Sequence, residues 1–230
     1  MTTRIRLALS SVLLVSIAGA ASAGTISHAD LPNGTTSQDF TLGGVNVTVS
    51  ASVRSFKSKT VNGRTGVGIA GGAVDGEIDG ATEAIEFTFS EPVTIDALCV
   101  SFLYTDGNFG DVGDEVARFV TDLGDFTLTA TTASSATWTS PSGAVSNISL
   151  GNNSGGGEWL LDTNLRDAGG IFGAPITSLE LRSGAPGAQG KYSDFAFVTT
   201  TFSASLPTPG AGALLGAAGL VAASRRRRAA

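Results

Sequence analysis

Apolar and polar residues alternate along much of the middle of the chain. Residues 45–53 place valine or alanine at every second position, and the same period of two runs through residues 85–89 and 126–130. This period is typical of a β-strand with one buried face. Further strand-like runs cover residues 97–104, 116–120, 145–150, 159–161, 176–181 and 195–202.

Clusters of Gly, Asn, Asp and Pro separate these runs, as turns between strands require. No helical period stands out between residues 24 and 205, and no repeat of fixed length appears. We therefore expect an all-β domain over residues 24–205, an antiparallel β-sandwich of jelly-roll type with roughly ten short strands.

The first residues have a different pattern. Residues 1–6 contain two arginines, residues 7–20 are almost wholly apolar, and Ala21, Ser22 and Ala23 follow. A basic start, a short apolar run and a small-x-small site predict a signal peptide over residues 1–23, cut after Ala23 by signal peptidase. The apolar run is shorter than the roughly 18–20 residues that span a bilayer, so a signal helix is favoured over a permanent transmembrane helix.

The last 25 residues form a second candidate targeting segment. Pro207, Thr208 and Pro209 precede residues 210–224, which are small, apolar and uncharged, and an arginine cluster follows (Arg225, Arg226, Arg227 and Arg228). Arginine clusters stay on the cytoplasmic side of a membrane. Fifteen helical residues cover only about 22 Å of a core of about 30 Å, so the segment predicts a short hydrophobic helix that anchors transiently.

This order of elements resembles the PEP-CTERM sorting signal of exported bacterial proteins, although Thr208 replaces the usual glutamate between the two prolines. The resemblance implies recognition by the membrane protease exosortase, delivery to the cell surface or the extracellular matrix, and an association with exopolysaccharide production. A plain C-terminal anchor is the alternative.

Charge and cysteine content restrict the partners that the body can bind and the cross-links that it can form. Six of the 14 basic residues lie in the two ends, whereas all 20 acidic residues lie between them, so the body has a net charge of −12. Such a body repels nucleic acid and anionic lipid, and it can attract divalent cations. Cys99 is the single cysteine, so no intrachain disulfide forms, and its apolar surroundings predict a buried side chain.

Clustered carboxylates between residues 75 and 86 indicate a cation site. Asp75, Glu77 and Asp79 stand beside glycines, and calcium prefers such oxygen ligands. The spacing matches an EF-hand only in part, and the flanking runs predict strands, so we predict a calcium site on a β-hairpin. The alternative is a solvated acidic hairpin. Residues 66–89 also loosely resemble the β-sandwich bodies of other PEP-CTERM proteins. The segment 191–197 resembles the last strand of carbohydrate-binding jelly rolls, which implies a calcium ligand at Asp194.

Two further features are candidate ligand sites. The acidic loop 106–115 offers Asp106, Asn108 and Asp111 to a cation or to hydroxyl groups. Trp159 follows a glycine-rich loop that could present its ring to a sugar, although a large aromatic residue within a strand is more often part of the core.

The only histidine, His28, lies close to the predicted mature N-terminus, which makes histidine-dependent catalysis a weak hypothesis. We expect a non-catalytic protein of the cell surface or extracellular matrix that associates with exopolysaccharide. The alternative is a secreted glycosidase or polysaccharide lyase, which requires only two well-placed carboxyls.

Overall fold

The alternating runs of the sequence form antiparallel β-strands. The computed structural model describes residues 23–107, 113–143, 145–149, 157–164, 170–184 and 193–205. Within these ranges there are 13 strands, one 3-10 helix, η1 (His28–Asp30), and no α-helix. The strands are β1 (Ala23–Ser27), β2 (Ser37–Leu42), β3 (Val45–Ala51), β4 (Phe56–Val61), β5 (Arg64–Ile69), β6 (Ala84–Ser101), β7 (Val116–Thr121), β8 (Gly124–Thr132), β9 (Ser135–Thr139), β10 (Val145–Ser149), β11 (Trp159–Asp162), β12 (Ile176–Ser183) and β13 (Ala196–Ala204).

Each described strand pairs with its neighbours in antiparallel orientation, which confirms the prediction of an all-β, antiparallel fold. The expected signal helix and C-terminal helix fall on residues outside the described ranges. Among the residues that the structure describes, no helix has the length and apolar character needed to cross a bilayer.

The strand β6 connects the two parts of the sheet. Its first half, residues 84–89, lies between β3 and β12, whereas its second half pairs with β13 and β11. The change of partners occurs at Ser90, Glu91 and Pro92, all of which are exposed. Proline has no N–H to give to a ladder, so it fits a point where one set of partners ends.

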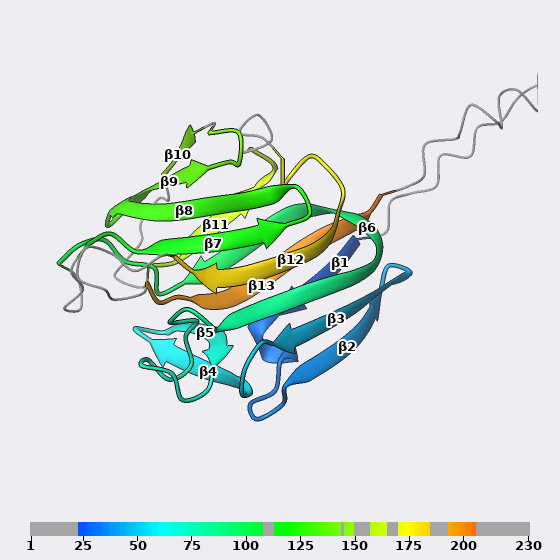
Figure 1. Cartoon of the computed structure of the whole chain (residues 1–230), viewed down its shortest axis with the longest axis horizontal. Helices are drawn as coiled ribbons and strands as arrows, with labels where there is room; N and C mark the ends of the chain where they lie inside the picture. The colour runs from blue at the N-terminus through cyan, green and yellow to red at the C-terminus, as the bar shows by residue number, and fades with distance from the viewer. Residues whose placement is uncertain are drawn as a thin grey trace, which may run out of the picture.

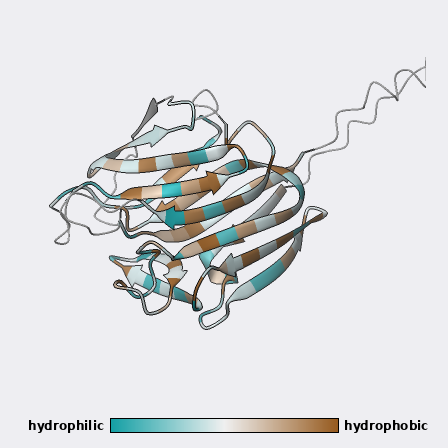
Figure 2. Cartoon of the chain, viewed as in Figure 1, coloured by the Kyte–Doolittle hydropathy of each residue, from teal (hydrophilic) through white to brown (hydrophobic). Residues whose placement is uncertain are grey.

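The two halves of β6 lie in facing parts of the structure, since β13 and β1 run behind the first half of β6 in Figure 1. Phe87 on this first half meets Phe197 of β13, and Phe89 meets Phe202, each pair with ring centroids 5.2 Å apart. Hydrophobic and polar residues alternate along the strands (Figure 2), and the apolar residues of this pattern are buried in one core cluster. One apolar core therefore lies between the facing strands.

A second aromatic group closes the core around Trp138 of β9. Its ring stacks on Phe126 with a centroid distance of 5.4 Å and also contacts Phe119 and Phe172. These rings come from strands β7, β8 and β9 and from the segment before β12, so they fix the far strands of the sheet to the core.

The first and last described strands lie side by side. Ala23 of β1 is opposite Ser203 of β13, and Gly24 is opposite Phe202. A Cβ at Gly24 would lie 2.6 Å from the Phe202 ring and 2.8 Å from Leu42, so only glycine fits there. The two ends of the described domain are thus held together at one edge.

Several strands differ from the sequence-based prediction. The runs 85–89 and 97–104 were predicted as separate strands, but they belong to the single strand β6, because the chain stays extended through Pro92. It ends at Ser101, and Phe102 has a φ of 66° that leaves the strand conformation. Strands β1, β2, β4 and β9 were not predicted, because their apolar positions are few or are occupied by alanine and glycine.

We predict that Phe87→Ala lowers the free energy of unfolding by about 3–5 kcal/mol, because it removes a fully buried ring and leaves a cavity beside Phe197. Leu160→Ala, at a side chain that is 47% exposed, should change it by about 0.5 kcal/mol or less. Urea unfolding followed by tryptophan fluorescence measures both. Equal effects of the two substitutions would contradict this core assignment.

Candidate functional site

The acidic segment between β5 and β6, residues 70–83, is a compact loop packed against the sheet. The Ile69 N–H donates to the Glu77 carbonyl, and the Ile78 N–H donates to the Phe195 carbonyl. A Cβ at Gly68 would lie 2.3 Å from the Glu77 backbone, so the glycine allows the loop to lie directly on β5. The loop thereby joins β5 to the start of β13, where Asp194 lies.

Three carboxylates of this loop accept hydrogen bonds from its own backbone. Asp75 Oδ1 accepts from the Gly71 N–H at 2.7 Å, Asp79 Oδ2 accepts from the Val74 N–H, and Glu83 Oε2 accepts from the Asp79 N–H at 2.9 Å. Loops rich in glycine leave many N–H groups without ladder partners, and aspartate and glutamate supply acceptors for them. These three carboxylates therefore stabilise the folded conformation of the loop.

Glu77 has a different environment, because its side chain is 5% exposed and lies against strand β4. Lys59 Nζ is 2.7 Å from Glu77 Oε1. Burial raises the pKa of the Glu77 carboxyl to about 8; Lys59 opposes this change, and the hydrogen-bonded Asp194 side chain adds to it. Of the four residues predicted to bind calcium, Glu77 and Asp194 thus lie close together. Asp75 and Asp79 instead accept hydrogen bonds from the backbone of the loop.

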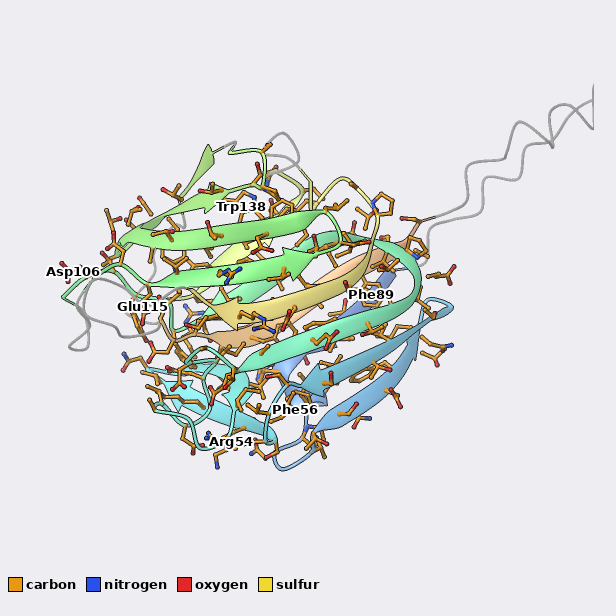
Figure 3. The ribbon with its side chains drawn as sticks, in the orientation of Figure 1. Arg54, Phe56, Phe89, Asp106, Glu115 and Trp138 are labelled. Atoms are coloured by element: carbon orange, nitrogen blue, oxygen red, sulfur yellow. The ribbon has the colours of Figure 1, made fainter. Side chains whose placement is uncertain are left out.

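The basic residues that form ion pairs with the loop 70–83 belong to one β-hairpin. The basic hairpin, which we define as β4 and β5 with Arg54 before them, holds three ion pairs to acids from other segments. Arg54 meets Glu83 at 3.4 Å, Lys59 meets Glu77, and Arg64 reaches both oxygens of Glu158 at 3.1 Å. Figure 3 shows Arg54 at the side of the molecule formed by β4 and β5. The hairpin therefore ties two acidic segments to the sheet, the loop 70–83 through two ion pairs and the residue before β11 through one.

A second acidic group surrounds the loop after β6. The buried Glu115 accepts a hydrogen bond from the Tyr104 N–H through Oε2, and the Asp194 N–H donates to its Oε1 at 3.5 Å. Asp106 Oδ1 accepts from the Gly113 N–H at 2.9 Å. Asp106 and Glu115 lie at the same end of the molecule, far from Phe89 (Figure 3). Of the predicted ligand residues in this loop, Asp106 is exposed, while Asn108 and Asp111 lie outside the described ranges.

The structure corrects the proposed role of Trp159. Its side chain is 1% exposed, it lies on β11 opposite Val100, and its indole N–H donates to the Leu103 carbonyl at 2.9 Å. The ring is part of the core and has no face open to a sugar. The glycine-rich segment before it suggested exposure, but pairing of β11 with β6 turns the ring inward.

Cys99 is buried as expected, with 5% of its surface exposed. Burial raises the pKa of its thiol to about 12; Glu158 acts in the same direction, and Arg64 opposes it. The thiol is therefore protonated at neutral pH and unreactive as a nucleophile.

Within the described ranges, no group of three or more His, Cys, Asp or Glu side chains has the arrangement needed to hold a metal ion. The calcium site over Asp75, Glu77, Asp79 and Asp194 stays a prediction from sequence. Sequence analysis did not single out Lys59, Arg54 or Glu115, because each meets its partner only through the folding of strands that are distant in sequence.

The residues predicted to direct export also lie outside the described ranges, apart from Ala23, which is the first residue of β1. These are Ala21, Pro207, Thr208, Pro209, Arg225, Arg226, Arg227 and Arg228.

We predict a pH-dependent contribution of Glu83 to stability. Burial raises its pKa from 4.5 to about 7 in the folded protein, so folding favours the protonated acid. This contribution is fully present below about pH 4.5 and is lost as the pH rises through about 7. Glu83→Gln removes this titration, so the stability of the variant relative to the wild type should rise from about pH 5 to about pH 8.

Chemical denaturation at several pH values measures this difference for Glu83→Gln. Glu91→Gln, at an exposed carboxyl on the bend of β6, is the control and should show a constant difference from the wild type. A flat difference for Glu83→Gln would show that Glu83 does not titrate in this range.

Comparison of the chain with models of protein families, with curated proteins and with solved structures gives no match.

Proposed function

We propose that the protein is exported and works without catalysis at the cell surface or in the extracellular matrix, where its body associates with exopolysaccharide. The body is a β-sandwich of jelly-roll type in this proposal, supported by the aromatic contacts between facing strands such as Phe87 and Phe197. The sequence patterns of the two ends support export, and the resemblance of the C-terminal tail to the PEP-CTERM sorting signal supports an association with exopolysaccharide.

The observation that carries the proposal is the pairing of β1 with β13. The signal peptide is predicted to end at Ala23, and Ala23 lies opposite Ser203, three residues before the predicted tail begins at residue 206. A leader and a tail that leave the domain at one edge can both face the membrane during export. The domain then folds between them without having to reorient.

The same geometry supports a binding role for the opposite end of the domain. Asp194 precedes β13, and Ser203 lies near its end, so about eight strand residues, or roughly 25 Å, separate them. The acidic loops around Asp106, Glu115 and Asp194 therefore lie away from the edge where the ends leave (Figure 3). A tail held at the membrane presents this acidic end outward, with Asp106 exposed to a ligand.

We predict that deletion of residues 206–230 moves the protein from the envelope fraction into the periplasm or the medium. The deletion removes the predicted apolar helix and the arginine cluster but leaves β13, which ends at Ala204. Fractionation and N-terminal sequencing test this, and Gly24 should be the first residue of both forms. A full-length chain that keeps Met1 and stays in the cytoplasm would contradict the proposed export.

We predict that the purified protein sediments with the exopolysaccharide of its host and that Asp106→Asn weakens this binding by roughly tenfold, the effect of losing one hydrogen bond to a charged group. The asparagine oxygen can still accept from the Gly113 N–H, so the loop keeps its fold. Glu91→Gln, at the bend of β6, is the matched control. Absence of retention on any polysaccharide, with or without calcium, would count against the binding role.

A further inference from the structure

We propose that Lys59 and Glu77 condense into an intramolecular amide bond, which covalently joins strand β4 to the loop 70–83. Lys59 Nζ lies 2.7 Å from Glu77 Oε1, and the Asp194 carboxyl lies near that of Glu77. An amine in contact with a carboxyl, with a second carboxyl nearby, supplies the groups that such a condensation uses. The proposal is independent of export and of polysaccharide binding.

Glu77 is held in this position from both sides. Its carbonyl accepts from the Ile69 N–H at 3.0 Å, and the next residue, Ile78, donates its N–H to Phe195. The close approach to Gly68 presses the Glu77 backbone onto β5. The backbone of Glu77 is therefore fixed against β5, and its side chain is only 5% exposed, so burial confines the carboxyl group beside the lysine. Such placement can supply much of the barrier lowering in an intramolecular reaction.

Space for the lysine is provided by residues without side chains. Lys59 lies opposite Gly66 in the ladder between β4 and β5. A Cβ at Gly76, whose φ of 88° favours glycine, would be only 3.0 Å from Lys59 Cβ. Gly76 therefore leaves room for the start of the lysine side chain, and Lys59 Nζ lies 5.9 Å from the centre of the Phe102 ring, which shields one side of the pair.

The reaction requires a neutral carboxylic acid as the electrophile and a free amine as the nucleophile. Burial favours the neutral acid at Glu77, whose side chain is 5% exposed. Asp194 lies near Glu77, and we assign its carboxylate as the acceptor of the proton that the lysine ammonium group gives up.

The condensation of Lys59 with Glu77 conserves atoms and charge. The ammonium group of Lys59 gives one proton to the Asp194 carboxylate, and Nζ forms a bond to Glu77 Cδ. The bond from Cδ to the hydroxyl oxygen breaks, and this hydroxyl leaves as water with a second proton from Nζ. The products are a secondary amide, one water molecule and a protonated Asp194, and no oxidant or cofactor takes part.

An amide cross-link at this position would stabilise the domain in the way that a disulfide does in other proteins. The chain has a single cysteine, Cys99, so it cannot form an intrachain disulfide. The amide would close a loop of about 18 residues between positions 59 and 77, and closing a loop of this size restricts the unfolded chain as a disulfide does. It would also hold β4, an outer strand of the sheet, to the core.

The test is the mass of the denatured, purified full chain compared with that of Lys59→Arg prepared in the same way. The wild type should be lighter than its sequence requires by one water molecule, and fragmentation should locate the link between Lys59 and Glu77. Lys59→Arg keeps the positive charge but lacks the nucleophile, so it should have its full mass. Processing at the ends shifts both masses alike.

Two further variants separate the roles. Asp194→Asn should prevent or slow the loss of water, whereas Glu91→Gln, at an exposed carboxyl on the bend of β6, should leave it intact. The Tm of Lys59→Arg should fall by roughly 5–10 °C, as expected for loss of a cross-link of this loop size. A wild type of full mass would overturn the proposal, as would a loss of water that persists in Lys59→Arg.

Discussion

The strand β6 is the constraint on which the other strands depend. It is hydrogen-bonded to β3 and β12 along its first half and to β13 and β11 along its second half. A chain that turned back at Pro92 would separate these strands into two sheets without a common member. Because β6 continues instead, Phe87 and Phe89 are placed opposite Phe197 and Phe202, and the core between the facing strands closes.

The charge distribution imposes a second constraint. A body with a net charge of −12 repels itself, and its acids are concentrated in loops that must pack against the sheet. The basic hairpin relieves this locally, since Arg54 and Lys59 face glutamates of the loop 70–83 and Arg64 faces the glutamate before β11. The hairpin strand β4 has little apolar surface of its own beyond Phe56, so these ion pairs complement its packing.

The sequence predicted strands whose apolar side chains alternate, such as β3, β8 and β12, because burial on one face selects that pattern. It did not predict β4, where only Phe56 is buried, or the continuity of β6, because Ser90, Glu91 and Pro92 have the composition of a turn. The contact of Lys59 with Glu77 spans 18 residues and depends on the glycines at 66, 68 and 76, which local patterns do not reveal. Trp159 was misplaced for the same reason, since its burial is decided by Leu103 and Val100.

The position of β13 bears on how an anchored domain would resist force. It has β6 on one side and β1 and β5 on the other, so it is an inner strand of its part of the sheet. A tail attached after Ala204 would pull along the axis of this strand, across hydrogen bonds that run perpendicular to it. Both ladders must then shear together instead of opening one bond at a time. An edge strand in the same place would have only one ladder to resist the load, so the arrangement suits a domain held at a surface by its C-terminal end.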